Sequence, residues 1–155
     1  MRLLCDEMLA GLSRWLRAAG HDTALVPTGT QDAAVLAQCC AEGRVLISRD
    51  RRLVREAGAA VPALLLMGES MDDHARTLTD ALGLDWTFAP FTRCLVDNAT
   101  LRPASEDDLR RIPAQSRALP GPFRVCPCCG RVFWPGSHVR RMAARLARWR
   151  GLAST

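Results

Sequence analysis

The chain has 155 residues, of which 48% are hydrophobic and 24% charged, so it is long enough for one packed domain with a small appendage and too apolar for wholesale disorder. Its net charge of +5 favours a polyanionic partner, but all 21 basic residues are arginine, a bias typical of a GC-rich genome, so the charge carries little weight. The seven cysteines indicate metal ligation in a reducing cytoplasm. No apolar run has the length of a signal peptide or a membrane span, so we expect no membrane partner.

The first half of the chain alternates short apolar runs with helical patterns, which is typical of a parallel sheet covered by helices. Asp32 stands where a helix N-cap would stand, and Gly20, Gly43 and Gly83 stand at the C-terminal ends of helices. The pattern predicts an α/β fold with strands at 3–5, 22–26, 45–47 and 63–67, and helices at 8–18, 33–41, 51–57 and 72–82.

The pattern changes after Pro90, where Cys, Pro and turn residues interrupt any long regular element. Met142, Leu146 and Trp149 then recur at helical spacing among many arginines, which predicts a basic amphipathic helix over 138–150. The arginines of this helix could bind an RNA backbone, although a solvent-exposed helix face is the simpler interpretation. The predicted organisation is a domain at 1–88, a cysteine-bearing module at 91–139, and a basic helix and tail at 140–155.

Several residues of the first half are predicted to have no part in catalysis or binding. We expect Trp15 to be a core aromatic on an amphipathic helix rather than a platform for base stacking. His21 and His74 have no visible partner and are predicted to lie at the surface. Cys39 and Cys40 are predicted to be small buried hydrophobes.

Carboxylates follow two of the predicted strands. Asp6 and Glu7 come directly after the first strand, and Asp50 follows the third. Ligands bind beyond the carboxyl ends of strands in an open parallel sheet, so these acids should lie at one edge. Asp32 begins a helix, and helices in such folds begin at that same edge.

Converging carboxylates repel one another unless a hard cation such as Mg²⁺ or Mn²⁺ holds them together. Such a cation can activate water and stabilise the charge that builds on a phosphodiester. In the competing interpretation, Asp6 ends a strand, Asp32 caps a helix and Asp50 forms a turn. Position alone does not decide between the two.

Three segments resemble the Mut-seven-C RNase domain family: LCDEMLAGLSRWLR at 4–17, Gly-His-Asp-Thr at 20–23 with Asp32 beyond it, and LISRDR at 46–51. The resemblance extends to about Met142 and implies a PIN-like nuclease domain with a zinc ribbon behind it. It implies a catalytic metal site at Asp6, Asp32 and Asp50, with Ser48 in the hydroxyl position and Arg14, Arg17 and Arg49 available to bind phosphate oxygens.

The resemblance leaves two acidic positions open. Asp22 also matches the family, but it could simply cap a turn or pair with an arginine. PIN-like sites often carry a fourth acid after a later strand, and Glu69, Asp72 and Asp73 are the candidates here.

The Cys-x-x-Cys-Gly run at 126–130 is a knuckle of the kind that binds zinc. In the resembling family a Cys-x-x-Cys-Asn knuckle precedes it, but this chain has Asp97 at the second cysteine position, after Cys94. The implied ligands of a structural zinc are therefore Cys94, Asp97, Cys126 and Cys129, a weaker set than four cysteines, with Cys128 or His138 as substitutes. In the competing interpretation the module has lost its metal.

The resemblance implies a metal-dependent ribonuclease whose partner is RNA, and it raises the expectation of a homodimer. The alternative is a catalytically inactive RNA-binding or adaptor protein that uses the zinc ribbon. A phosphoacceptor receiver domain and a P-loop nucleotide site both need a lysine, and the chain has none.

Overall fold

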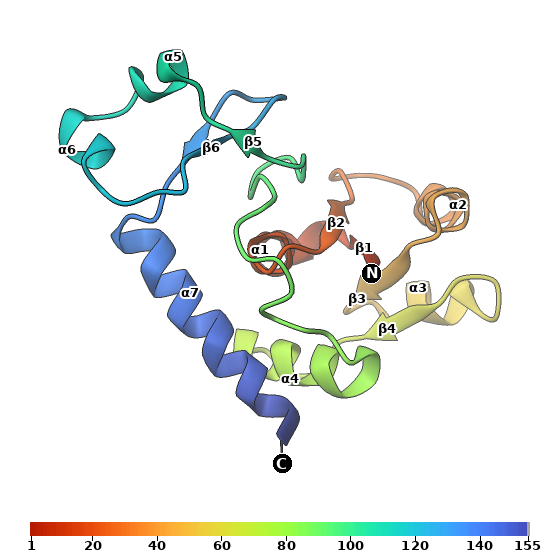
Figure 1. Cartoon of the computed structure of the whole chain (residues 1–155). Helices are drawn as coiled ribbons and strands as arrows, with labels where there is room; N and C mark the ends of the chain where they lie inside the picture. The colour runs from red at the N-terminus through yellow and green to blue at the C-terminus, as the bar shows by residue number, and fades with distance from the viewer. Residues whose placement is uncertain (155) are drawn as a thin grey trace.

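The computed structural model describes residues 1–154, and Thr155, the end of the predicted tail, lies outside them (Figure 1). None of the described helices is long and apolar enough to cross a membrane. The first half contains β1 (Arg2–Cys5), η1 (Glu7–Leu9), α1 (Ala10–Ala18), β2 (Asp22–Leu25), α2 (Asp32–Glu42), β3 (Val45–Ser48), α3 (Arg51–Ala57), β4 (Ala63–Leu65) and α4 (Met71–Leu82). The second half contains β5 (Arg102–Pro103), α5 (Glu106–Leu109), α6 (Ala114–Arg117), β6 (Arg124–Val125), β7 (Val132–Phe133), α7 (Ser137–Arg150) and η2 (Gly151–Ser154).

The strands of the first half form a parallel sheet in the order β2-β1-β3-β4, which confirms the predicted α/β fold. Cys5 of β1 is in register with Leu25 of β2 and Ile47 of β3, so the three strands end at one edge. The strand order reverses between β1 and β3, and ligands in such sheets bind beyond the carboxyl ends at that reversal. Asp6 and Ser48 lie at this position.

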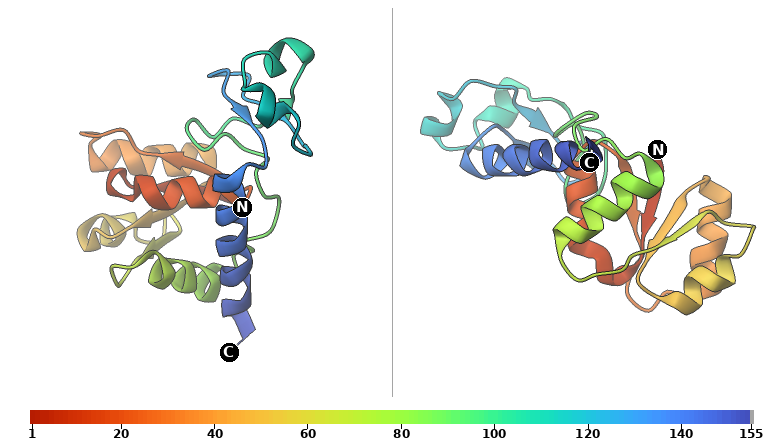
Figure 2. Two further views of the ribbon diagram at one scale, coloured as in Figure 1. Left: turned by 90° about the vertical axis from the view of Figure 1, so that its left-hand side faces the viewer. Right: turned by 90° about the horizontal axis from the view of Figure 1, so that it is seen from below.

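Helices cover both faces of the sheet (Figure 2). Leu3 and Leu4 are adjacent on β1 and fully buried on opposite faces. Leu3 belongs to a core shared with α1, α4 and α7, whereas Leu4 packs with α2 and α3. Burial on both faces explains why the strands are continuous apolar runs rather than alternating patterns.

The C-terminal helix α7 packs beside α1 and α4 (Figures 1 and 2). Met142, Leu146 and Trp149 are buried in the core of the first half, as their helical spacing predicts. The Trp149 ring lies 4.9 Å from that of Trp15 and 4.8 Å from that of Trp86, so Trp15 is a core aromatic as predicted. The division of the chain into three domains stays a prediction.

Gly20 fixes the path of the chain after α4. Its φ is +98°, and a Cβ at this position would lie 2.2 Å from the carbonyl oxygen of Ala89. The backbone N–H groups of Ala89 and Phe91 donate to the carbonyls of Ala19 and Ala18, so the segment that enters the second half is held against the end of α1. Only glycine allows this approach.

The structure corrects the surface positions predicted for two histidines. Both His21 and His74 are 5% exposed. The Nε2 of His21 donates to the carbonyl of Asp85 at 2.8 Å, and its ring stacks on Phe88 at 5.3 Å. Burial lowers the pKa of His21, because desolvation disfavours the charged ring.

Two smaller predictions are also wrong. Gln31 is the N-cap of α2, and Asp32 is the first residue of the helix rather than its cap. Cys39 is buried as predicted, but Cys40, its neighbour on the same helix, is exposed.

The second half contains a small antiparallel sheet in the order β5-β6-β7. Its strands have two residues each, and the helices α5 and α6 between β5 and β6 have four, which is too short for a periodic sequence signal. Asp108 and Ser105 form a capping box that begins α5.

Candidate functional site

Asp6 and Ser48 meet across the carboxyl ends of β1 and β3. The Oγ of Ser48 donates to Oδ2 of Asp6 at 2.7 Å, and the backbone N–H of Glu7 donates to Oδ1 at 2.8 Å. Asp6 is 9% exposed and Ser48 is fully buried, so the carboxylate is held in one orientation. The sequence places both residues at this edge, and the structure brings them into direct contact.

Asp50 extends this chain of hydrogen bonds. The Oγ of Ser48 accepts from the backbone N–H of Asp50 at 2.9 Å. The Oδ1 of Asp50 accepts from the N–H groups of Arg52 at 2.8 Å and Leu53 at 3.3 Å, and so caps α3. Ser48 therefore links the two acidic residues that follow β1 and β3.

Asp32 is the first residue of α2, directly after the loop that follows β2. Glu7 holds this loop, because its Oε2 accepts from the backbone N–H of Gly29 at 2.8 Å. Within residues 1–154, however, Asp32 does not join Asp6 and Asp50 in a group whose ligand atoms all lie within 4.8 Å of one another. A Mg²⁺ ion keeps several of its waters and needs only one or two direct carboxylate ligands, so the wider spacing is compatible with this cation.

The three acids at this edge form no ion pair within residues 1–154, although the charge of Arg52 interacts with Asp32 and Asp50. No ion pair among the described residues includes Asp6, Asp32 or Asp50, although the chain has 21 arginines. Six acids elsewhere in the described chain are paired and seven are not; the paired ones are Asp22, Glu42, Glu56, Asp72, Asp107 and Asp108. Oxygen donors with uncompensated negative charge are the ligands that Mg²⁺ and Mn²⁺ prefer.

A cavity of about 220 Å³ lies at the Arg49 side of this edge and is lined by Arg49, Glu69, His74, Met8, Leu9, Gly11, Leu12 and Met71. Of the three candidates for a fourth acid, Asp72 accepts hydrogen bonds from Trp149 and two arginines of α7. Asp73 is engaged with Ser70 in the capping box of α4. Glu69 alone lines the cavity and has no hydrogen-bond partner in the described part of the chain.

The three arginines predicted to bind substrate occupy different environments. Arg49 lines the cavity, and Arg14 is exposed on α1, with its Nη2 3.3 Å from Nε2 of His138. Arg17 is 5% exposed, and its guanidinium donates to the carbonyls of Thr23 at 2.9 Å, Leu95 at 3.1 Å and Val96 at 2.9 Å. Its burial indicates a structural role in place of the predicted contact with phosphate.

Asp22 lies at the opposite end of the sheet from Asp6, because it begins β2 in register with Arg2. Its carboxylate pairs with Arg2 and Arg44 and accepts from Nδ2 of Asn98 at 2.7 Å. Although partial burial acts to raise it, these hydrogen bonds and charges hold the pKa of Asp22 well below its usual range. Of the two roles that the sequence leaves open, pairing with arginine is the observed one.

Four predicted ligands converge in the second half. The candidate ligand atoms of Cys94, Asp97, Cys126 and Cys129 all lie within 4.8 Å of one another. The Sγ atoms of Cys94 and Cys129 are 3.7 Å apart, which matches the separation of about 3.8 Å between two thiolates on a tetrahedral zinc. Cys128 is outside this group, and His138 contacts Arg14, so neither substitutes for Asp97.

The two halves of this Cys₃Asp group are built alike. Residues 93 and 100 form an antiparallel bridge around the first half, and Val125 pairs with Val132 around the second. Each turn ends in a residue with positive φ, which is Asn98 at 72° and Gly130 at 74°. Asparagine and glycine tolerate this conformation best, so the Asn after Asp97 is a sequence signal for a knuckle although a ligand cysteine is missing.

Burial and hydrogen bonding act in opposite directions on the thiols of this group. The N–H groups of Cys128 and Cys129 both point to Sγ of Cys126 at 3.4 Å, which favours a thiolate, but burial outweighs them and raises the pKa of Cys126. The backbone N–H and the guanidinium of Arg131 lower the pKa of Cys129, whereas burial raises the pKa of Cys94 to about 12. Metal binding must therefore displace a proton from Cys94.

The first knuckle is attached to the first half of the chain. The Oδ1 of Asn98 accepts from the backbone N–H of Thr23 at 2.9 Å, while its Nδ2 donates to Asp22. Arg17 holds the carbonyls of Leu95 and Val96. The sequence shows Asn98 as part of the knuckle pattern, but not its attachment to β2, because those partners are distant in the chain.

These features define an α/β protein with a polar edge at its strand reversal and a Cys₃Asp group that could hold a metal such as zinc. Residues 1–146 match the Mut7-C RNAse domain family, and the chain belongs to that family. No curated protein and no solved structure gave a significant match. The family assignment indicates a nuclease of the ribonuclease type.

Proposed function

We propose that the protein is a PIN-like, metal-dependent ribonuclease that hydrolyses RNA phosphodiester bonds at the edge formed by Asp6, Asp32 and Asp50. The observation that carries this proposal is the hydrogen-bonded series Asp6–Ser48–Asp50 across the strand reversal, with no arginine paired to either carboxylate. Membership of an RNase domain family supports the same reaction class.

Asp6, Asp32 and Asp50 would hold Mg²⁺ or Mn²⁺, which supplies activation of water and stabilisation of charge on the phosphodiester. Ser48 keeps Asp6 oriented and couples it to the position of Asp50. Glu69 is our candidate for the fourth acid.

Arg14 and Arg49 are the proposed phosphate-binding residues, because both are exposed, Arg49 directly after β3 and Arg14 on the helix that follows Asp6. Arg49 lies beside the cavity that Glu69 lines, and Arg14 lies about 6 Å along the axis of α1 from its first residue, Ala10. A planar guanidinium binds phosphate oxygens in pairs. RNA is thus the proposed partner.

The same proposal includes a structural zinc in the Cys₃Asp group and a cytoplasmic location. The homodimer stays a prediction.

Cleavage of an end-labelled single-stranded RNA by the purified chain in Mn²⁺ tests the reaction. We expect Asp6→Asn and Asp50→Asn to lower the rate more than about 100-fold, and Ser48→Ala to lower it about 10- to 100-fold, as for residues that orient metal ligands. Replacing Mn²⁺ by Ca²⁺ should abolish cleavage while leaving the cysteine group undisturbed, which a strong chelator would not.

Asp80→Asn is the matched control, since Asp80 is exposed on α4, away from the edge. Cleavage that survives Asp6→Asn but varies with enzyme preparation would point to a contaminating nuclease and overturn the assignment. Metal-independent binding of RNA without any cleavage would favour the adaptor.

A further inference from the structure

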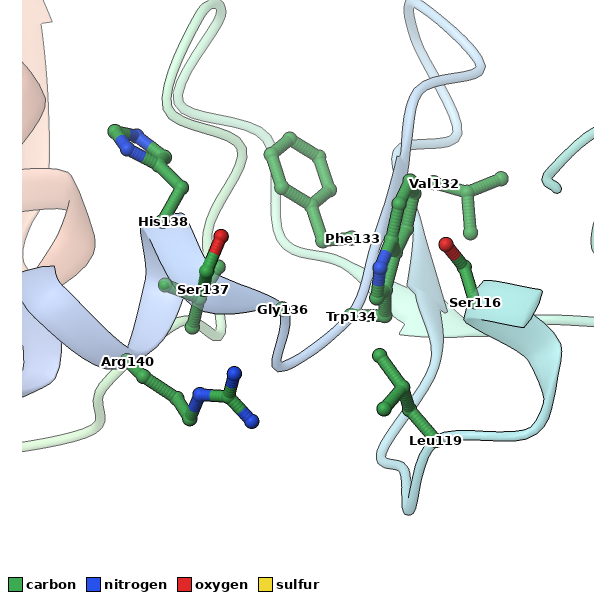
Figure 3. A pocket seen from close by; sticks show the side chains of 10 residues that line it. Ser116, Leu119, Val132, Phe133, Trp134, Gly136, Ser137, His138 and Arg140 are labelled. Carbon is green, nitrogen blue, oxygen red and sulfur yellow. The ribbon is translucent and has the colours of Figure 1, made fainter.

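The second half contains three adjoining hollows that share one aromatic wall. Their volumes are about 530, 250 and 400 Å³, and Phe133 and Trp134 line all three. Figure 3 shows the largest, where the indole of Trp134 stands over a space bounded by Leu119 and Arg140. We call the three together the Trp134 groove.

The walls of the Trp134 groove combine aromatic rings with arginines. Its polar lining includes Arg111, Arg124, Arg131 and Arg140, and no Asp or Glu occurs among the described residues that line it. Arg140 is exposed and forms no ion pair in the described part of the chain. Arg111 pairs with Asp108, but Arg124 and Arg140 are in none of the ion pairs of the described residues, so the groove still offers positive charge beside flat apolar surface.

Trp134 differs from the buried tryptophans in its hydrogen bonding. The Nε1 atoms of Trp86 and Trp149 donate to Thr79 and Asp72, whereas that of Trp134 has no partner within residues 1–154. A Cβ at Gly136 would lie 3.2 Å from this Nε1, so the glycine keeps the edge of the indole open. The half-buried ring lines all three hollows, so part of its surface is available to a ligand.

The groove adjoins α1 of the first half. His138 lines it and lies 3.3 Å from Arg14, which is in the middle of the helix that follows Asp6. A strand held in the groove could thus reach Arg14. A second copy of this chain fits less well, because it would also carry a net charge of +5 and would bury Arg140 without a carboxylate partner.

From these observations we propose that the Trp134 groove binds single-stranded RNA, with a base stacked on Trp134 and the adjacent phosphates on Arg140 and Arg14. This proposal rests on the proposed ribonuclease function and assigns the second half a part in substrate binding. Every base presents a flat face, so the contact is tolerant of sequence, and only an unpaired base can enter.

The test is fluorescence anisotropy of a labelled single-stranded RNA with Asp6→Asn protein, which removes cleavage from the measurement. We expect Trp134→Ala to weaken binding about 5- to 150-fold, the range for loss of one stacked base. Arg140→Gln should weaken binding and reduce the slope of log affinity against log salt by about one. Double-stranded RNA should bind with little dependence on Trp134.

Phe88→Ala and Arg55→Gln are the matched controls, because Phe88 is 62% exposed near His21 and Arg55 is exposed on α3. Zinc content and circular dichroism establish that each variant is folded. Unchanged RNA affinity in folded Trp134→Ala and Arg140→Gln would overturn the proposal. So would variants that alter the sedimentation of the protein but not its RNA affinity, because the groove would then bind a second copy of the chain. The anisotropy experiment measures binding and not cleavage. A protein that fails to cleave RNA would therefore refute the proposed ribonuclease, while the binding measurement would still test the Trp134 groove separately.

Discussion

Replacing Arg17 by methionine separates a structural role from a substrate-binding one. Methionine fills most of the same space but removes the donors that serve Thr23, Leu95 and Val96. Hydrogen bonds to charged groups contribute about 1.5–3 kcal/mol each on mutational scales. Part of this is offset, because burial of the guanidinium is itself unfavourable and lowers the pKa of Arg17.

We therefore expect Arg17→Met to lower the free energy of unfolding by about 3 kcal/mol, and the Tm by about 6–12 °C for a chain of this size. Thermal unfolding followed by circular dichroism, with zinc and protein concentration fixed, measures this. The first knuckle also loses two of its attachments, so zinc should leave the Cys₃Asp group faster.

Arg14→Met is the matched control, because Arg14 lies three residues earlier on the same helix and is exposed. We expect its unfolding free energy to change by less than about 0.5 kcal/mol, while its affinity for RNA falls. The reasoning is refuted if Arg17→Met unfolds at the wild-type temperature and loses affinity for RNA, since Arg17 would then reach the substrate.

Two further predictions concern protonation and metal. Burial holds the pKa of His21 below its usual 6.5, so the unfolded chain takes up the proton first and stability should fall as pH drops below about 6.5. His21→Gln, which keeps a donor for Asp85, should flatten the dependence of Tm on pH between about 7.5 and 5.5, whereas the exposed-residue control His138→Gln should not. Asp97→Cys should slow transfer of zinc to a colorimetric chelator on the order of tenfold and Asp97→Ala should accelerate it, and equal rates in all three proteins would exclude Asp97 as a ligand.

The strands and the edge of the sheet follow from local sequence. Apolar runs bounded by glycine and polar residues define β1 and β3, and parallel strands must end together, so Asp6 and Asp50 are predicted without knowledge of tertiary contacts. Helical spacing likewise predicts the buried face of α7 through Met142, Leu146 and Trp149.

Residues whose partners are distant in the chain could not be predicted in this way. Arg17 and Leu95 are 78 positions apart, and His21 and Asp85 are 64 apart. An arginine on an amphipathic helix has the same local pattern whether it contacts phosphate or backbone carbonyls. Burial decides between them, and here it depends on the path that Gly20 allows the chain to take past α1.

The Cys₃Asp group also has a consequence for variation in chain length. A metal bound there would close a loop over residues 98–125, whose two ends are fixed by the paired knuckles. Loop-closure entropy depends weakly on length, and doubling such a loop costs only about 0.6 kcal/mol. The segment that carries α5 and α6 is therefore where insertions should be tolerated best, while a single added residue inside either knuckle would displace a ligand.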